Sequence, residues 1–378
     1  MHVGLNLVYL TPGATGGTEV YARELIPELV AAAPEDRFTA FVNRDTLGTP
    51  GPWTGLIDSV EVPVRALNRV AWVRGEQQLL PRLAARAGID LIHSLANTGP
   101  VWGRFRRIVT IHDLIYQAVP EMRGGARGRG MRLLVPLTAR RSDRVIVDAA
   151  STRTDLERLG AIRQSKIDVV PLGFGRSRDA TPTPERDLRR RLDAGDRAIA
   201  LSVSAKLPHK NLIRLLEAVA LLPAQTRPLL VLPGYPTPHE TELAARVAAL
   251  GIADAVRLMG WVSAEDLEGL YAAAAVFVFP SLYEGFGLPV LEAMARGVPV
   301  ACTGTGALGE VAGDAALHFD PRSAPAIADT IRRLLQDPAE AHRLARAGPE
   351  RAAAFSWRAT AAGTLAVYRR ALADRRTR

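Results

Sequence analysis

The chain has 378 residues, of which 48% are hydrophobic and 23% charged, a composition typical of a globular protein with room for two full cores. No window of ~18 uninterrupted apolar residues occurs and no basic-then-apolar leader opens the sequence, so we predict a cytoplasmic protein, neither membrane-spanning nor secreted. The single cysteine, Cys302, excludes internal disulfides and fits a reducing compartment.

The net charge of +9 predicts an anionic partner, and much of the positive charge lies within residues 104–144. Because this stretch has neither interleaved aromatic residues nor a nucleic-acid-binding motif, we expect no nucleic acid. An anionic membrane at the inner face of the plasma membrane, or an acidic lipid-linked acceptor, fits the charge better. The alternative is a solvated surface of arginines (Arg104, Arg106, Arg107, Arg123, Arg127, Arg129, Arg132, Arg140, Arg141 and Arg144).

The first half of the chain alternates short apolar strands with helices. Strands are predicted over 3–10, 38–42, 91–94, 108–111, 145–147 and 166–171, and helices over 19–33, 70–87 and 131–141. This alternation predicts an α/β domain over 1–175 with a parallel, doubly wound sheet. The stretch 176–195 is rich in Pro, Gly and charged residues, and is expected to link this domain to a second one over 196–356.

Two places in the first half are candidate binding positions. Gly16 and Gly17 lie between the first strand and the first helix, where a glycine-rich loop can approach a phosphate. His112 directly follows a predicted strand, at the end of an open sheet where ligands bind. A histidine that bonds a neighbouring carbonyl is the alternative for His112, and His93 is similarly placed but lacks supporting residues.

The second half repeats the alternation. Strands are predicted over 198–203, 229–232, 256–258 and 276–279, and helices over 212–222, 240–250 and 264–273. The loop 204–211, SAKLPHKN, places Lys206 and Lys210 at the end of a strand, a cationic site for a diphosphate. Solvated lysines are the alternative. A closing helix over 357–376 has an apolar face that must pack on a partner.

The stretch 276–303 carries the strongest motif: a strand, a glycine-containing loop, a short helix and a second strand. Gly285 and Gly287 permit positive φ, Pro289 suits the first turn of a helix, and the helix amino end is a ready phosphate site. Glu284 and Glu292 flank that place and can accept hydrogen bonds from hydroxyls. A phosphate flanked by hydroxyl-bearing groups indicates a nucleotide-sugar. The alternative interpretation of this stretch is an ordinary turn with two solvated glutamates.

With these residues the chain resembles the retaining glycosyltransferases of family 4, which have the GT-B architecture. The E-x7-E motif from Glu284 to Glu292 carries the resemblance, together with Gly16-Gly17, His112-Asp113, the KLPHKN loop, the tract 310–321 and the closing FSW. The resemblance implies two Rossmann-like domains that face a cleft, with the closing helix crossing back to the first domain. It also implies that Glu284 and His112 face each other across that cleft.

The resemblance also implies residue roles. Glu292 would bind the ribose, Glu284 the donor sugar and Lys210 the leaving diphosphate, while His112 would lie beside the transferred sugar. Many members have an arginine six residues before this lysine; Ser204 stands there, so Lys206 is assigned to the diphosphate instead. The predicted site comprises His112, Glu284 and Lys210 for catalysis, and Gly16, Gly17, Lys206, Lys210, Gly285, Phe286, Gly287, Leu288 and Glu292 for the donor.

The expected reaction moves a hexosyl group from a nucleotide-diphosphate sugar to a hydroxyl of a glycan, glycolipid or lipid-linked acceptor, with retention. Mannose is one option by analogy, and UDP and GDP remain open. No cofactor and no metal are expected, because lysines, backbone donors and a helix dipole can stabilise the leaving diphosphate. A nucleotide-sugar epimerase and an inactive glycan-binding subunit are the alternative functions.

Overall fold

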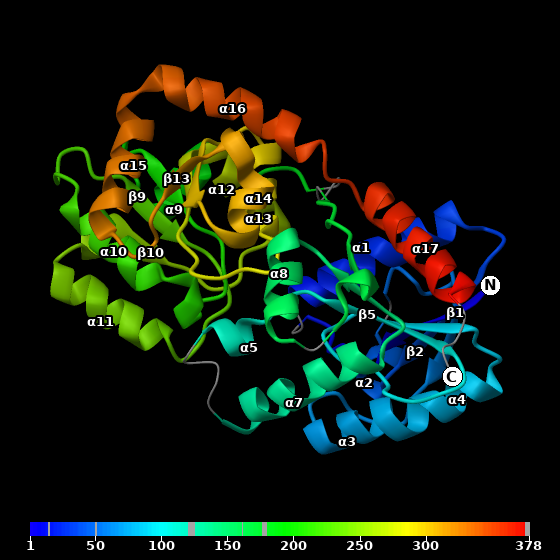
Figure 1. Ribbon diagram of the computed structural model, residues 1–378. Helices are drawn as coiled ribbons and strands as arrows, with labels where there is room; N and C mark the ends of the chain where they lie inside the picture. The colour runs from blue at the N-terminus through cyan, green and yellow to red at the C-terminus, as the bar shows by residue number, and fades with distance from the viewer. Residues whose placement is uncertain (14–15, 50, 120–124, 161, 176–179, 375–378) are drawn as a thin grey trace. The chain divides into compact units, whose positions relative to one another are not determined.

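The computed structural model describes residues 1–378 except 14–15, 50, 120–124, 161, 176–179 and 375–378. The side chains of 125–127 are also not described. The chain forms two compact units (Figure 1). The first comprises Met1–Gly173 and Phe355–Arg378, and the second Phe174–Ala354. No helix in the described ranges combines the length and apolarity needed to cross a membrane.

A seven-stranded parallel sheet forms the centre of the first unit, in the order β3-β2-β1-β4-β5-β6-β7. The chain builds outward from β1 in one direction and then from β4 in the other, so the topological switch point lies between these two strands. The strands are β1 (His2–Leu7), β2 (Arg37–Val42), β3 (Asp58–Glu61), β4 (Leu91–Ser94), β5 (Arg106–Ile111), β6 (Arg144–Val147) and β7 (Ile167–Val169).

The predicted parallel sheet is confirmed, with two local corrections. Strand β3 was not predicted, because DSVE is a largely exposed edge strand without an apolar run. The single helix predicted over 70–87 is three consecutive segments, with a π-helical turn in the middle. The helical segments are α1 (Gly17–Ala32), α2 (Arg44–Leu47), α3 (Arg69–Arg74), the π turn Gly75–Leu79, α4 (Leu80–Arg86), α5 (Ile115–Ala118), α7 (Gly125–Arg141), α8 (Ala150–Arg158) and a 3-10 turn, Gln164–Lys166.

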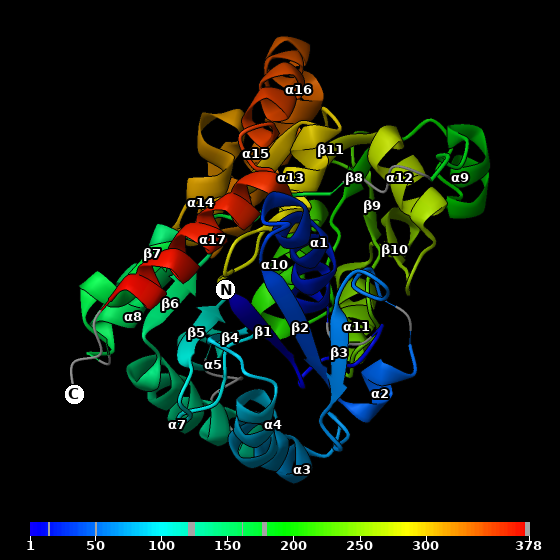
Figure 2. The same cartoon turned by 90° about the vertical axis from the view of Figure 1, so that its right-hand side faces the viewer.

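The closing helix α17 (Trp357–Ala373) belongs to the first unit, as the resemblance implied. It packs against α1 (Figure 2). Its predicted apolar face is buried: Trp357, Leu365, Val367 and Tyr368 are all shielded from solvent. Ser356 caps its amino end by accepting a hydrogen bond from the Ala359 N–H.

A six-stranded parallel sheet, in the order β10-β9-β8-β11-β12-β13, forms the centre of the second unit. Here the switch point lies between β8 and β11. The strands are β8 (Ile199–Leu201), β9 (Leu229–Leu232), β10 (Val256–Leu258), β11 (Ala274–Phe279), β12 (Val300–Thr303) and β13 (Leu317–Phe319). With the parallel sheet of the first unit, this sheet confirms the predicted pair of Rossmann-like domains.

Helices cover this sheet on both sides, and one of them lies inside the stretch predicted as a linker. Residues 185–192 form α9, because Leu188 and Leu192 are one turn apart and both are buried within the second unit. The helical segments are α9 (Glu185–Leu192), α10 (Leu212–Leu221), α11 (Glu240–Leu250), α12 (Ala264–Ala273), α13 (Leu288–Ala295), α14 (Gly306–Ala312), α15 (Ala324–Gln336), α16 (Pro338–Ala352) and 3-10 turns at Pro208–Lys210, Ala253–Ala255 and Gly313–Ala315.

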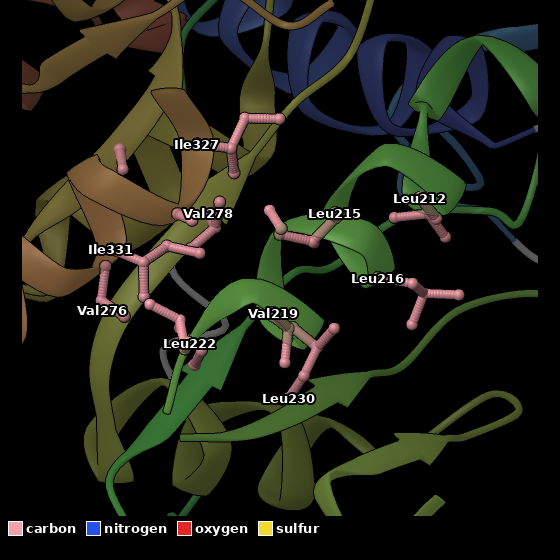
Figure 3. Packing of buried hydrophobic residues seen from close by; sticks show 14 of the residues in the cluster. Leu212, Leu215, Leu216, Val219, Leu222, Leu230, Val276, Val278, Ile327 and Ile331 are labelled. Carbon is pink, nitrogen blue, oxygen red and sulfur yellow. The ribbon is translucent and has the colours of Figure 1, made fainter. Parts of the chain in front are cut away.

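The core of the second unit holds the two strands that flank its switch point. Leu212, Leu215, Leu216 and Val219 recur at helical spacing along one face of α10, and are fully or almost fully buried (Figure 3). They belong to the same cluster as β11 and α15, through Val276, Val278, Ile327 and Ile331. This packing fixes the strands from which the loops described below emerge.

Candidate functional site

The second unit brings Lys210 and Glu284 together. Lys210 lies in the loop after β8, and Glu284 in the loop after β11, the neighbouring strand across the switch point. Lys210 Nζ lies 2.6 Å from Glu284 Oε1, and 5.4 Å from the centre of the Phe279 ring. The side chains keep 16% and 14% of their surface exposed, so a ligand can still reach the pair. The carboxyl edge at a switch point is where open α/β sheets bind ligands.

Local hydrogen bonds hold the Lys210 loop in place. Asn211 adopts the left-handed conformation, with φ 57°, that asparagine tolerates better than most residues. Its Nδ2 donates to Pro280 O at 3.1 Å and to Pro321 O at 2.7 Å, so it ties the Lys210 loop to those after β11 and β13. His209 O accepts from Leu282 N at 2.9 Å. Sequence reasoning included Asn211 in the KLPHKN motif but assigned it no role.

His209 does not add positive charge to this loop. Burial, reinforced by the neighbouring Lys210 ammonium, lowers its pKa to about 4, so the imidazole is neutral at neutral pH. The positive charge at the tip of the loop therefore comes from Lys210.

The structure places Lys206 differently from the sequence prediction. Its side chain is fully buried, and its Nζ donates to Gly234 O at 3.1 Å and to Met259 O. Glu240 Oε2 lies 3.4 Å from the same Nζ. The ammonium thus joins the ends of β9 and β10 inside the second unit, so we take Lys206 out of the proposed diphosphate site. The spacing of the motif does not reveal which lysine turns inward.

The amino end of α13 lies directly after Glu284. Gly287 precedes the helix with φ 119°, a backbone conformation that favours glycine, and a Cβ at this position would lie 2.6 Å from Leu308 Cδ2, so that side chain would have to shift. Gly285 is not among the residues with positive φ, which corrects the expectation for that position. Helix geometry leaves the first N–H groups, such as that of Leu288, without intrahelical acceptors, and the dipole makes this end positive.

Glu292 lies one turn into α13 and is supported by two residues that sequence reasoning missed. Tyr271 OH donates to Glu292 Oε2 at 3.0 Å, and the Arg296 guanidinium packs 4.6 Å from the Tyr271 ring centre. Burial raises the pKa of Glu292, while the Tyr271 hydrogen bond and the Arg296 charge oppose that shift. Arg296 itself pairs with Glu268. The result is an oriented, shielded carboxyl group that can accept hydrogen bonds from hydroxyls.

A pocket of about 420 Å³ also opens at the carboxyl edge of this sheet, within the range typical of small-molecule sites. None of the predicted site residues lines it, although Leu282, two residues before Glu284, does. Both polar and apolar groups line the pocket (Leu282, Gly304, Thr305, Phe319, Asp320, Pro321 and Arg322). Sequence reasoning did not predict this pocket, because its residues come from three loops that are separate in the sequence.

In the first unit, Gly16 and Gly17 form the amino end of α1. Gly16 has φ 67° and precedes the helix, while Gly17 is its first residue, and both are exposed. Glu19 shapes the loop: its carboxylate accepts hydrogen bonds from Gly13 N at 2.8 Å and from Arg23 Nε at 2.9 Å. A glycine amide at a helix amino end is suited to meet a phosphate, as predicted for Gly17.

His112 directly follows β5, as predicted, but its ring is bonded on both sides. Nδ1 lies 2.7 Å from Asp148 Oδ2, and Nε2 lies 2.9 Å from Leu95 O. The Tyr21 ring meets the imidazole edge-on, with 4.7 Å between centroids. The alternative expectation of a carbonyl partner is therefore correct for Nε2, while Asp148 was not anticipated.

His93 is a buried structural residue. Its Nε2 lies 2.8 Å from Thr110 Oγ1 and its Nδ1 2.7 Å from Tyr368 OH, so it links β4 to β5 and to α17. Burial lowers its pKa to about 3, which keeps the ring neutral.

The predicted site residues thus divide between the two units. Gly16, Gly17 and His112 belong to the first unit, and the residues from 206 to 292 to the second. The meeting of Glu284 with His112 stays a prediction. Among the described residues, no group of three or more His, Cys, Asp or Glu side chains is arranged to hold a metal ion.

Two family models match the chain, one in each half. Residues 15–178 match the family model described as Glycosyltransferase Family 4, and residues 185–351 the model described as Glycosyl transferases group 1. O-antigen chain mannosyltransferase B from Escherichia coli is 33% identical over 70% of this chain and 70% of its own length. The MMP alpha-(1->4)-mannosyltransferase of Mycolicibacterium hassiacum is 37% identical over 62% of this chain and 56% of its own length.

Two solved structures show the same fold. The sucrose-phosphate synthase of Thermosynechococcus elongatus superposes with a TM-score of 0.79 at 24% identity, over 99% of each chain. Anabaena HepE in complex with UDP-glucose superposes with a TM-score of 0.75 at 19% identity, over 97% of this chain and 99% of that one. These matches, with the E-x7-E loop and two parallel-sheet units, show that the chain belongs to glycosyltransferase family 4, with the GT-B fold.

Proposed function

We propose that this glycosyltransferase moves a hexosyl group, in the first instance mannose, from a nucleotide-diphosphate sugar to a hydroxyl of a glycan or lipid-linked acceptor, with retention. The observation that carries the proposal is the Lys210–Glu284 pair beside the amino end of α13, at the switch point of the second sheet. The mannosyltransferase names of two relatives support mannose as the first sugar to test.

In the proposed site, Lys210 turns its ammonium to the leaving diphosphate, beside the N–H groups at the start of α13. This arrangement concentrates positive charge where negative charge develops in the transition state. Glu284, held close to Lys210, accepts hydrogen bonds from the sugar, and Glu292, oriented by Tyr271, accepts them from the ribose.

The proposed chemistry needs no covalent intermediate. The bond from the anomeric carbon to the diphosphate oxygen breaks, and its electron pair leaves with the phosphate. The acceptor oxygen bonds to the anomeric carbon on the same face, and its proton passes to the departing phosphate. We propose that no metal takes part, because Lys210 and the helix amino end supply the stabilising positive charge.

The test is a donor panel with product analysis. The protein is incubated with GDP-mannose, UDP-glucose and dTDP-sugars, with and without glycan and lipid-linked acceptors, and with EDTA in a parallel series. We expect nucleotide release that depends on an acceptor, a product with retained anomeric configuration and no loss of rate with EDTA. Conversion of the donor without an acceptor would indicate an epimerase instead, and no response to any donor would indicate a binding subunit.

Two variants test the assigned residues, and a third is their control. Lys210→Ala and Glu292→Gln should lower kcat/KM for the donor by on the order of 100-fold, the loss of one charge-stabilising or orienting contact. The matched control is Glu242→Gln, whose carboxylate lies exposed on α11 and should leave the rate unchanged. Wild-type rates for Lys210→Ala or Glu292→Gln would remove these residues from the site.

A second proposal concerns the acceptor side: we infer that the surface of α3 and α7 binds an anionic membrane. Figures 1 and 2 both show these helices at the same end of the first unit. Val70, in α3, is 82% exposed and Leu133, in α7, is 74% exposed. Exposed arginines lie close in sequence to both apolar residues (Arg69, Arg129, Arg132 and Arg140). Exposed apolar side chains among arginines are typical of a face that inserts at a charged interface.

Part of the basic stretch 104–144 serves the fold instead. Arg106 pairs with Asp143 at 3.0 Å, and Arg144 with Asp168 at 2.7 Å. Arg123 and the side chain of Arg127 lie outside the described part of the chain. The charge available to a membrane is therefore smaller than the count in the sequence.

Vesicle co-sedimentation tests this surface. Binding is expected to vesicles with 30% phosphatidylglycerol and not to pure phosphatidylcholine, and to weaken with salt. Arg129→Glu with Arg132→Glu should abolish binding while transfer to a soluble acceptor continues. Equal binding of this double variant and the wild type would disprove the assignment.

A further inference from the structure

The His112 ring has no nitrogen left to accept a proton from a substrate. Leu95 O can only accept a hydrogen bond, so His112 Nε2 carries a hydrogen. Nδ1 faces Asp148 Oδ2 at 2.7 Å, a distance typical of a charge-assisted hydrogen bond. Both ring nitrogens are thus held in hydrogen bonds to groups of the protein itself.

Strand register explains why Asp148 and His112 meet. Ile111, the last residue of β5, pairs with Val147, the last residue of β6. His112 and Asp148 follow these two residues, so they emerge side by side from neighbouring strands. Asn97 Oδ1 also accepts a hydrogen bond from His112 N at 2.8 Å, which fixes the backbone at this point.

Burial makes the two groups depend on each other. Asp148 is 2% exposed, and in the described part of the chain its Oδ1 has no hydrogen-bond partner. Burial by itself lowers the pKa of His112, but the charge and hydrogen bond of Asp148, with the Leu95 carbonyl, outweigh it and raise that pKa. Burial also raises the pKa of the Asp148 carboxyl, while the charge and the hydrogen bond of His112 oppose that rise, so each group favours the charged form of the other.

The other titratable groups around the ring do not replace Asp148. Asp113, the next residue along the chain, also favours the charged ring, but as a weaker contribution. His93, behind the ring on β4, is neutral and Tyr21, on α1, keeps its phenol proton because burial raises its pKa. Asp148 is therefore the group that sets the charge of His112.

We propose that Asp148 is a positioning residue that holds His112 as a doubly protonated ring, so that His112 contributes positive charge to sugar transfer and does not act as a general base. This inference rests on the proposed place of His112 in the site. A fixed cation on the first unit would add to the stabilisation of the departing diphosphate that Lys210 begins. The acceptor proton then has to leave with the phosphate, as in the proposed same-face reaction.

Nuclear magnetic resonance tests the protonation state in the wild-type protein, with one variant used only to assign the signals. The ring nitrogens of ¹⁵N-histidine-labelled protein report whether one or both carry hydrogen. We expect His112, assigned from the His112→Gln spectrum, to show two protonated nitrogens at neutral pH. His93 serves as the internal control, because it should show a neutral ring over the same range. A neutral His112 ring at pH 6.5 would overturn the inference.

Kinetics test the consequence. Wild-type kcat/KM should fall as the pH rises through the raised pKa of His112, and Asp148→Asn should move that fall about 1 to 3 units lower. Asp148→Glu, which keeps the carboxylate, should retain the wild-type profile, and thermal melting shows whether each variant folds. Asp148→Asn combined with His112→Gln should be no slower than His112→Gln alone.

The outcomes separate the inference from the proposed function. If His112→Gln transfers sugar at the wild-type rate, the proposed place of His112 in the site is wrong. If His112→Gln is slow but Asp148→Asn leaves the pH profile unchanged, the site stands and the role of Asp148 fails. A wild-type rate that rises as histidine loses its proton would show that His112 is a base.

Discussion

Replacing Lys206 by methionine distinguishes the buried position of this lysine from a role in donor binding. Methionine keeps most of the side-chain volume but removes the ammonium that donates to Gly234 O and Met259 O. Each buried carbonyl left without a donor costs about 1–3 kcal/mol. Glu240 Oε2, which lies 3.4 Å from this ammonium, is shielded from solvent and would lose its charge partner, which adds to the cost. The ammonium itself no longer has to be desolvated, which offsets part of the loss.

We therefore expect Lys206→Met to lower the free energy of unfolding of the second unit by about 3 kcal/mol. For a unit of this size that corresponds to a fall in Tm of roughly 6–12 °C. Differential scanning calorimetry measures it, and donor titration at a temperature where the variant is folded measures binding. The matched control is Lys210→Met: this lysine is partly exposed, so we expect a Tm change of at most about 4 °C together with a large loss of donor affinity.

The result that would refute this reasoning is the opposite pattern. If Lys206→Met melted at the wild-type temperature and lost donor affinity, the lysine would contact the diphosphate, as its position in the motif first indicated. The buried position of Lys206 and its contacts to Gly234 O and Met259 O would then belong to the donor-free protein, and donor binding would move the lysine.

Three further variants test other features of the structure. Gly287→Ala should lower the free energy of unfolding by on the order of 1–3 kcal/mol, because alanine is strained at φ 119° and its Cβ would displace the Leu308 side chain. The same strain at the start of α13 should raise the donor KM, and an unchanged KM would contradict this. Burial raises the pKa of Glu76 from 4.5 to about 7. Between these two pH values the unfolded chain has lost the Glu76 proton while the folded protein keeps it, so the free energy of unfolding should fall by ~3 kcal/mol as the pH rises from 4.5 to about 7. Glu76→Gln should remove that dependence in urea unfolding at several pH values, and a dependence that persists would assign it to other groups. Tyr368→Phe should deprive His93 Nδ1 of its partner and speed hydrogen exchange along α17, whereas unchanged exchange would mean that apolar packing alone docks that helix.

Much of the fold could be predicted from local pattern. Apolar runs of strand length alternating with helical periodicity are enough to predict parallel sheets, and most strand and helix positions agree with the structure to within a few residues. The errors have local causes. The edge strand β3 has no apolar run, and α9 lies in a stretch whose charge and proline content hide two buried leucines.

The candidate site could be predicted only in part. Glu284 and Lys210, which the structure places side by side, could be singled out because each lies in a motif whose glycine, proline and charge spacing is visible in sequence. Tyr271 and Arg296 were missed because they come from α12 and the end of α13, and only packing brings them to Glu292. The pocket at the ends of β11, β12 and β13 was missed for the same reason.

By itself the sequence determined the alternation of strands and helices, the E-x7-E loop and which residues end each strand. The tertiary structure decided which of those ends are neighbours and which side chains face inward. Strand order is a long-range property, so nothing in the residues around position 148 indicates that Asp148 lies beside His112. In the same way, Lys206 and Lys210 share one loop, and only the carbonyl groups of Gly234 and Met259, far along the chain, draw the first of them into the interior.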